Sequence, residues 1–144
     1  MPLMLSGLAL ANANLGKHGL VDKDGEDGLM YSLEVLGLNL QGTNLVSLSA
    51  CDTGKGVVDY SEGHYGLVRA FRTAGAKSVL MTLKSVKDKD AKEFMVEFYS
   101  IYLSSDNKAT PAQALHKTRL AFIEHVNSKY RGAEFWSPYV IIGR

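Results

Sequence analysis

Cysteine is nearly missing from this chain: one occurs in 144 residues, beside three prolines and one tryptophan. A lone thiol cannot form an internal disulfide, and on its own it cannot hold a structural zinc ion. Cys51 is therefore either an inert core thiol or a reactive one. Because disulfides are excluded, a reducing cytoplasm is the expected compartment. Residues 1–13 are apolar and end in an Ala-x-Ala pattern like a secretory cleavage site, but the first basic residue is Lys17, so the charged start of such signals is missing.

An excess of either charge and a long apolar run are also lacking. Sixteen basic against fifteen acidic residues leave a net charge of +1, so no global positive field attracts nucleic acid. No apolar run approaches the ~20 residues of a membrane-spanning helix, and with 46% hydrophobic residues the chain is too apolar to be disordered. We expect one globular domain over residues 1–144, with neither nucleic acid nor a membrane as a partner.

Cofactor motifs are absent as well. Gly54-Lys55 resembles the end of a phosphate-binding loop, but Gly56 stands where Ser or Thr is required. The acidic spacing that starts at Asp22 resembles a calcium loop, but Asp27 replaces the required glycine. We expect no cofactor and no metal.

The middle of the chain predicts a strand, a helix and a second strand. Residues 45–50 form an apolar run of strand length, and residues 78–83 form another. Between them, Ser61 is a good N-cap and Gly75 a good helix-ending residue. This βαβ pattern predicts two parallel strands with a right-handed crossover.

The remaining elements complete an α/β layer structure. A short helix is expected around Tyr31–Leu36, and a longer one from Asp88 or Asp90 to about Leu103. A capping box with proline at the first helical position opens a further helix, and an apolar run of strand length ends the chain. We expect helices on both sides of a mostly parallel sheet. The inward residues of the two later helices are predicted to be Phe94, Met95, Phe98, Ile101 and Tyr102, and Leu115, Thr118, Phe122 and Val126.

Cys51 follows a predicted buried strand, and ligands and catalytic groups of parallel α/β sheets gather at the carboxyl ends of strands. A nucleophilic thiol needs a base, because at neutral pH a free thiol is only a few per cent ionised. His64 is the one histidine near Cys51 in the chain, while His18, His116 and His125 lie in other segments. Backbone amides after Cys51, in a loop containing Gly54 and Gly56, are candidates for an oxyanion hole.

Residues 45–54, Leu-Val-Ser-Leu-Ser-Ala-Cys-Asp-Thr-Gly, resemble the cysteine motif of CHAT domains. These are caspase-like peptidase domains often found beside tetratricopeptide repeats in bacterial proteins. The resemblance continues in order along nearly the whole chain, through residues 2–3, 6–11, 27–29, 61–71, 74–79, 110–115 and 135–140.

The resemblance implies a caspase-like fold in which a cysteine attacks the scissile carbonyl group and a histidine on a preceding strand acts as the base. Cys51 matches the nucleophile. The family histidine lies in a His-Gly motif upstream of the segment equivalent to Pro2-Leu3, and none of the four histidines of this sequence matches it. We therefore expect the chain to be the C-terminal part of a CHAT domain, incomplete at its N-terminus and inactive as given.

The same resemblance bears on three further residues, Asp52, Glu62 and Lys84. Asp52 and Glu62 match positions that are commonly acidic in the family, and either lines a pocket for a basic substrate side chain or is a solvated surface carboxylate. Lys84 stands where the family usually has tryptophan, which puts the shape of the substrate cleft in question. The expected partners are a protein or peptide substrate and tetratricopeptide repeats or the upstream half of the domain.

Two alternatives stay open at this point. In one, the chain is a non-catalytic binding or scaffold module that kept the fold and self-associates through an exposed sheet edge. In the other, it is an active enzyme in which His64 substitutes for the missing base.

Overall fold

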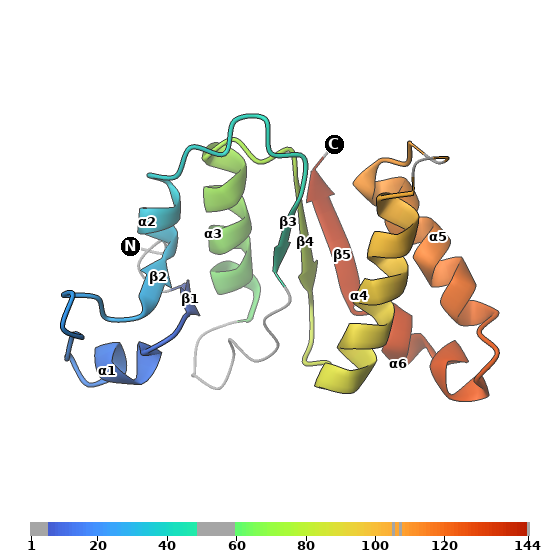
Figure 1. Ribbon diagram of the computed structural model, residues 1–144, viewed down its shortest axis with the longest axis horizontal. Helices are drawn as coiled ribbons and strands as arrows, with labels where there is room; N and C mark the ends of the chain where they lie inside the picture. Colours follow the sequence, from blue (N-terminus) through green and yellow to red (C-terminus); the bar gives the residue numbers. More distant parts are fainter. Residues whose placement is uncertain (1–5, 49–59, 105, 107, 144) are drawn as a thin grey trace. The chain divides into compact units, whose positions relative to one another are not determined.

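The computed structural model describes residues 6–48, 60–104, 106 and 108–143, with the backbone alone for residues 60–65 (Figure 1). The chain divides into two compact units, one formed by residues 1–43 and 53–76 and the other by residues 44–52 and 77–144. Each unit is α/β in character, as the sequence predicts, and each is described by itself.

The first unit begins with a pair of short antiparallel strands. β1 (Gly7–Ala9) pairs with β2 (Leu29–Tyr31), with Gly7 opposite Tyr31 and Ala9 opposite Leu29. The short helix α1 (Ala13–Lys17) lies in the connection between them, and the single-turn helix α2 (Ser32–Val35) follows β2 directly. Neither strand is predicted by the sequence, because a three-residue strand is too short to show an alternating pattern.

Backbone contacts fix the path of this pair. Gly28 has φ +70°, and a Cβ atom there would lie 2.3 Å from the carbonyl oxygen of Ala11. The N–H of Leu10 donates to the Gly28 carbonyl at 2.8 Å. Only glycine fits this close approach, since a side chain would collide with backbone that cannot move independently.

A carboxylate organises the loop between the two strands. Asp22 Oδ1 accepts hydrogen bonds from the N–H groups of Asp24 at 2.8 Å and Glu26 at 3.1 Å, and Oδ2 accepts one from Asn12 Nδ2 at 3.2 Å. The pKa of Asp22 lies below its ordinary value, chiefly because the backbone N–H of Glu26, then that of Asp24, stabilises the ionised form. The acidic residues of this loop therefore shape a turn.

The helix predicted after Cys51 is present as α3 (Tyr60–Thr73). Its described inward face contains Leu67, Val68, Ala70 and Phe71, all buried. Gly75 ends the helix as predicted, with φ +119° and a position where a Cβ atom would lie 2.7 Å from the backbone nitrogen of Gln41. The prediction of Ser61 as the N-cap was wrong, because the helix already begins at Tyr60.

The second unit contains a three-stranded sheet in the order β3-β4-β5. β3 (Val46–Leu48) and β4 (Ser78–Thr82) are parallel, as predicted, with Val46 opposite Val79 and Leu48 opposite Met81. β5 (Tyr139–Gly143) runs antiparallel to β4. The expectation of a mostly parallel sheet needs correction for the described residues, since one of their three strand pairings, β3 with β4, is parallel and the other two are antiparallel.

Helices α4 (Asp88–Tyr102) and α5 (Pro111–Ile123) pack together beside this sheet, followed by the 3-10 helix η2 (Ser128–Arg131) and the short helix α6 (Ala133–Trp136) (Figure 1). The capping box predicted for α5 is present. Thr110 Oγ1 accepts from the Gln113 N–H at 3.2 Å, and Gln113 Oε1 accepts from the Thr110 N–H at 2.9 Å. Each bond satisfies a backbone donor that the start of a helix leaves free.

Aromatic side chains form the core of this unit. Phe94 lies 3.8 Å from Tyr139, ring centroid to ring centroid, in a stacked arrangement, and 5.0 Å from Phe122. The predicted inward residues of α4 are buried or pack against this core. On α5, Leu115, Thr118 and Phe122 are buried as predicted. The prediction for Val126 was wrong, because it lies beyond the last residue of α5 and is 96% exposed.

Candidate active site

The carboxyl ends of β3 and β4 lie at one edge of the second unit's sheet, because the two strands are parallel. β5 begins at the same edge, where Tyr139 stands opposite Thr82. Just past β4, the N–H of Leu83 donates to the carbonyl of Pro138 at 2.9 Å, which joins the exit from β4 to the entry into β5. In α/β sheets this is the edge at which catalytic groups gather.

Two side chains at this edge face solvent. Leu83 is 53% exposed, and Lys84 is also exposed, whereas all five residues of β4 are buried. The boundary between buried and exposed residues therefore falls at the end of β4.

Arg119 of α5 reaches this edge from the helix layer. Its Nη2 donates to the carbonyl oxygen of Tyr139, the first residue of β5. An arginine hydrogen bond to a strand carbonyl fixes the helix against the start of the strand. We assign Arg119 a structural role in holding the β5 end of the edge.

The predicted site residues fall largely outside the described part of the chain. Cys51, Asp52 and the expected oxyanion-hole residues Gly54 and Gly56 belong to residues 49–59, which the structure does not describe. In the sequence, Cys51 is the third residue after Leu48, the last residue of β3. The roles predicted for these residues therefore remain predictions.

Glu62 and His64 belong to α3. Their side chains lie outside the described residues, so the predicted roles of Glu62 in substrate binding and of His64 as a substitute base remain predictions.

The other three histidines have described positions. His18 is the exposed residue that follows α1, and His116 is exposed on α5. The ring of His125, just past α5, lies 5.1 Å from that of Tyr130, and its Nδ1 accepts from the Asn127 N–H at 3.1 Å. These local contacts make His125 part of a turn.

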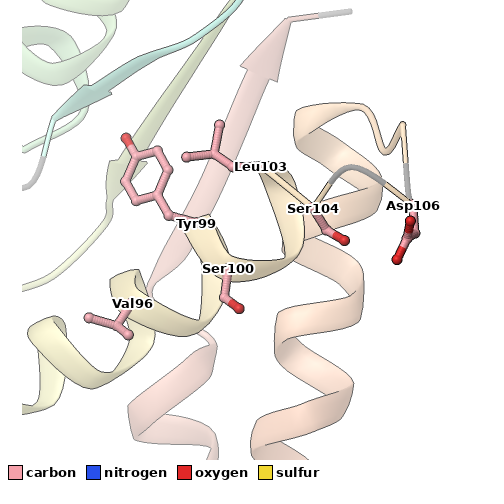
Figure 2. Close-up of a pocket in the computed structure, with 6 residues that line it drawn as sticks. All are labelled: Val96, Tyr99, Ser100, Leu103, Ser104 and Asp106. Atoms are coloured by element: carbon pink, nitrogen blue, oxygen red, sulfur yellow. The ribbon is translucent and has the colours of Figure 1, made fainter.

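A hollow lies on the outer face of α4, as Figure 2 shows. Tyr99 closes one side of it, and its hydroxyl is 2.6 Å from Ser47 Oγ on β3. The lining contains hydroxyls and one carboxylate, without cysteine or histidine, so it lacks the groups of a nucleophilic site. The lining residues are Val96, Tyr99, Ser100, Leu103, Ser104 and Asp106.

An ion pair joins η2 to the start of α4. Lys129 Nζ lies 3.0 Å from Oδ1 of the buried Asp90, and the same ammonium group is 5.0 Å from the centroid of the Tyr130 ring. The Asp90 hydrogen bond raises the pKa of Lys129 above its ordinary value. Because this ion pair holds η2 against the start of α4, the carboxylate of Asp90 has a structural role.

Comparison with protein families decides what kind of domain this is. The CHAT domain family matches residues 1–144, the whole chain. The chain belongs to the CHAT domain family. Among curated proteins, the comparison finds no match.

Membership confirms the resemblance seen in the motifs, and it makes the chain a caspase-like, peptidase-related domain. The motif segments of this CHAT domain fall in both units. Residues 6–11, 27–29 and 61–71 belong to the first, and residues 110–115 and 135–140 belong to the second. In the described part of the chain, no helix is both long enough and apolar enough to span a membrane.

Proposed function

We propose that this CHAT domain carries the nucleophile of a caspase-like cysteine peptidase, and that Cys51 is that nucleophile. The observation that carries the proposal is the family match over the whole chain, with Cys51 in the family's cysteine motif. Its place, three residues after a strand that is parallel to its neighbour, supports the same role.

The chemistry is acyl transfer. The Cys51 thiolate attacks the carbonyl carbon of the scissile peptide bond, and the C–N bond then breaks as the amine leaves with a proton from the base. Water hydrolyses the resulting thioester, releases the acid product and restores the thiol. The base is a histidine of the family's His-Gly motif, which is not among the 144 residues of this sequence, so these residues alone are expected to cleave peptides weakly or not at all.

Asp52 and Glu62 are proposed as substrate-binding residues. Carboxylates form strong, charge-assisted hydrogen bonds with arginine and lysine side chains, so a basic substrate side chain is the expected ligand. Their match to acidic family positions supports this role.

The test compares two forms of the protein, the 144-residue chain and a longer form that includes the upstream His-Gly segment. Both are assayed against a mixed peptide library, with cleavage products read by mass spectrometry. The longer form is expected to cleave peptides, and Cys51→Ala is expected to abolish that cleavage. Cys51→Ala with unchanged cleavage would overturn the assignment, and activity of the 144-residue chain that disappears in His64→Ala would favour His64 as the base.

A second candidate function is a binding module that works through self-association. Among the described residues, β3 pairs only with β4, and a strand edge without a partner can pair with a strand of another chain. Sedimentation velocity of the 144-residue chain tests this function. A concentration-dependent dimer supports it, and a monomer at all concentrations contradicts it.

A further inference from the structure

The outer face of α4 carries a continuous row of side chains, which we call the α4 stripe. It consists of Lys92, Val96, Tyr99, Leu103 and Asp106, at successive spacings of four, three, four and three residues. At 3.6 residues per turn, this spacing places the helical members on one face, one above the next. All but Lys92 line the hollow on α4, and Figure 2 shows them along the helix, with Asp106 just beyond its end.

The middle of the α4 stripe is apolar and faces solvent. Val96 is 61% exposed and Leu103 is 70% exposed, although the opposite face of the same helix buries Phe94 in the core. Tyr99 lies between them in the stripe, and its hydroxyl contact with Ser47 anchors it to β3. Single exposed apolar side chains are common, but two that share one helix face and line a hollow beside an anchored aromatic ring are typical of a docking surface.

The two ends of the α4 stripe carry opposite charges. Lys92 and Asp106 are both exposed, and neither side chain forms an ion pair with another described residue. Lys89 continues the stripe toward the start of the helix, and Glu93 flanks it. Lys108 follows Asp106 in the chain but does not line the hollow. The stripe is therefore basic at its start, apolar in its middle and acidic at its end.

This order of charges makes the α4 stripe complementary to itself. Lys92 and Asp106 each lie seven residues from Tyr99, on opposite sides of it. When a second copy packs its α4 antiparallel to the first about a two-fold axis near Tyr99, Lys92 faces Asp106 of the second copy, and Val96 faces Leu103 of the second copy. A parallel arrangement would oppose lysine to lysine and aspartate to aspartate, so the charges select the antiparallel one.

We propose that the α4 stripe is the interface of a two-fold symmetric dimer, and that its occupant is the α4 stripe of a second copy of this chain. The apolar contacts at the centre exclude water, and the two Lys92–Asp106 pairs at the ends set the direction of packing. Because one helix face on each side forms a small interface, we expect a dissociation constant in the micromolar range. The inference goes beyond the peptidase proposal and does not depend on it, and it uses a surface other than the edge of β3.

Charge reversal at the two ends of the α4 stripe tests the proposal in the 144-residue chain. Both side chains are exposed, so their substitution should leave the fold intact, which far-UV circular dichroism checks. Lys92→Glu opposes two carboxylates at each end of the dimer, and Asp106→Lys opposes two ammonium groups there. Each single variant is expected to raise the dissociation constant about tenfold at low ionic strength, measured by sedimentation velocity over a concentration series. The double variant faces opposite charges again and should return to within about threefold of the unsubstituted chain.

An equimolar mixture of the two single variants gives a sharper readout. In a mixed dimer, each end pairs a carboxylate with an ammonium group, so the mixture should dimerise like the unsubstituted chain although neither variant does so alone. Lys17→Glu is the matched control, because Lys17 is an exposed lysine on α1 and its reversal changes the net charge by the same amount as Lys92→Glu. It should leave the dissociation constant unchanged.

Three results would overturn the proposal. Single variants that dimerise as tightly as the unsubstituted chain, or an equal weakening in Lys17→Glu, would do so and would leave the edge of β3 as the candidate surface for self-association. A mixture of the single variants that forms no mixed dimer would also do so. A monomer at all concentrations would contradict both the α4 stripe and the β3 edge. The peptidase function fails separately, through full activity of Cys51→Ala in the longer form.

Discussion

The β1–β2 region, residues 6–31, and the α4–α5 core of the second unit are stabilised in opposite ways. No residue from Ser6 to Tyr31 is buried, and the two short strands are fixed by backbone hydrogen bonds and by glycines packed against backbone. In the α4–α5 core, Phe94, Phe98 and Phe122 are almost fully buried and contact one another or their aromatic neighbours. The two regions should therefore respond to opposite kinds of substitution.

Side-chain truncation is expected to matter most in the α4–α5 core. A buried aromatic ring leaves a cavity when it is removed, because close-packed neighbours relax only partly. In the β1–β2 region few side chains are buried, so truncating one should cost little. A methyl group added at a glycine of this region would instead collide with the backbone. Four predictions test this contrast.

The largest effect is expected for Phe94→Ala. Phe94 is fully buried, stacks on Tyr139 and contacts Phe122, so its loss should lower the free energy of unfolding by about 3–5 kcal/mol. Urea unfolding followed by fluorescence of Trp136, the only tryptophan, measures it. Val96→Ala on the same helix is the control, since Val96 is 61% exposed and its loss should cost no more than about 0.5 kcal/mol. Equal costs for the two variants would show that α4 is not held by its aromatic face.

The next effect is expected for Gly28→Ala, where the added Cβ atom would lie 2.3 Å from the Ala11 carbonyl oxygen at a positive φ. The free energy of unfolding should fall by about 2–3 kcal/mol from backbone strain and displacement together. Gly25→Ala is the matched control, because Gly25 also has a positive φ but has nothing within 4 Å of the added atom. Its cost should be about 1 kcal/mol. If both substitutions cost the same, the close approach does not contribute.

A smaller effect is expected for Thr110→Ala, which removes the side-chain cap at the start of α5. Loss of the Thr110 Oγ1 acceptor leaves the Gln113 N–H without its cap and should cost about 1 kcal/mol. Thr110→Ser keeps the hydroxyl and should stay within about 0.5 kcal/mol of the unsubstituted chain. Thermal unfolding of the three proteins compares them. A cost in Thr110→Ser equal to that in Thr110→Ala would assign the effect to the methyl group instead.

The smallest effect concerns the pH response of the β1–β2 region. The pKa of Asp22 is lowered in the folded chain by the Glu26 and Asp24 N–H groups. Its stabilising contribution is therefore present above the pKa of the unfolded chain and is lost as pH falls through the lower folded pKa. Carboxyl-carbon NMR should give a lower titration midpoint for Asp22 in the folded chain than in urea. Identical Asp22 midpoints in the folded chain and in urea would show that the hydrogen bonds do not stabilise the ionised carboxylate. The NMR signal of the Glu26 amide should shift with the same midpoint as Asp22, and Asp22→Asn should abolish that shift.

Much of the fold follows from local patterns in the sequence. The stripe of Phe94 and Phe98 predicts α4, and the pairing of Thr110 with Gln113 predicts the start of α5, because both signals act within one or two helical turns. The antiparallel direction of β5 does not follow from its residues. The run from Tyr139 to Ile142 predicts a strand, but its direction depends on how η2 and α6 lead the chain back to the sheet.

The candidate site, too, follows partly from local sequence patterns and partly from the fold. The apolar run before Cys51 predicts the strand that leads to it, and the family resemblance supplies the role of its thiol. The parallel pairing of β3 with β4 joins segments 33 residues apart in the chain, so the sheet edge at which both strands end depends on the fold and not on a local pattern.

The central claim is that Cys51 attacks the scissile carbonyl group, and trapping the acyl-enzyme tests it most directly. The longer form with the upstream His-Gly segment is mixed with a cleaved peptide, quenched in acid within one turnover, digested and analysed by mass spectrometry. The peptide containing Cys51 is expected to carry the acyl fragment of the substrate as a thioester that hydroxylamine removes. Turnover without any adduct on Cys51, or with the adduct on another residue, would contradict it.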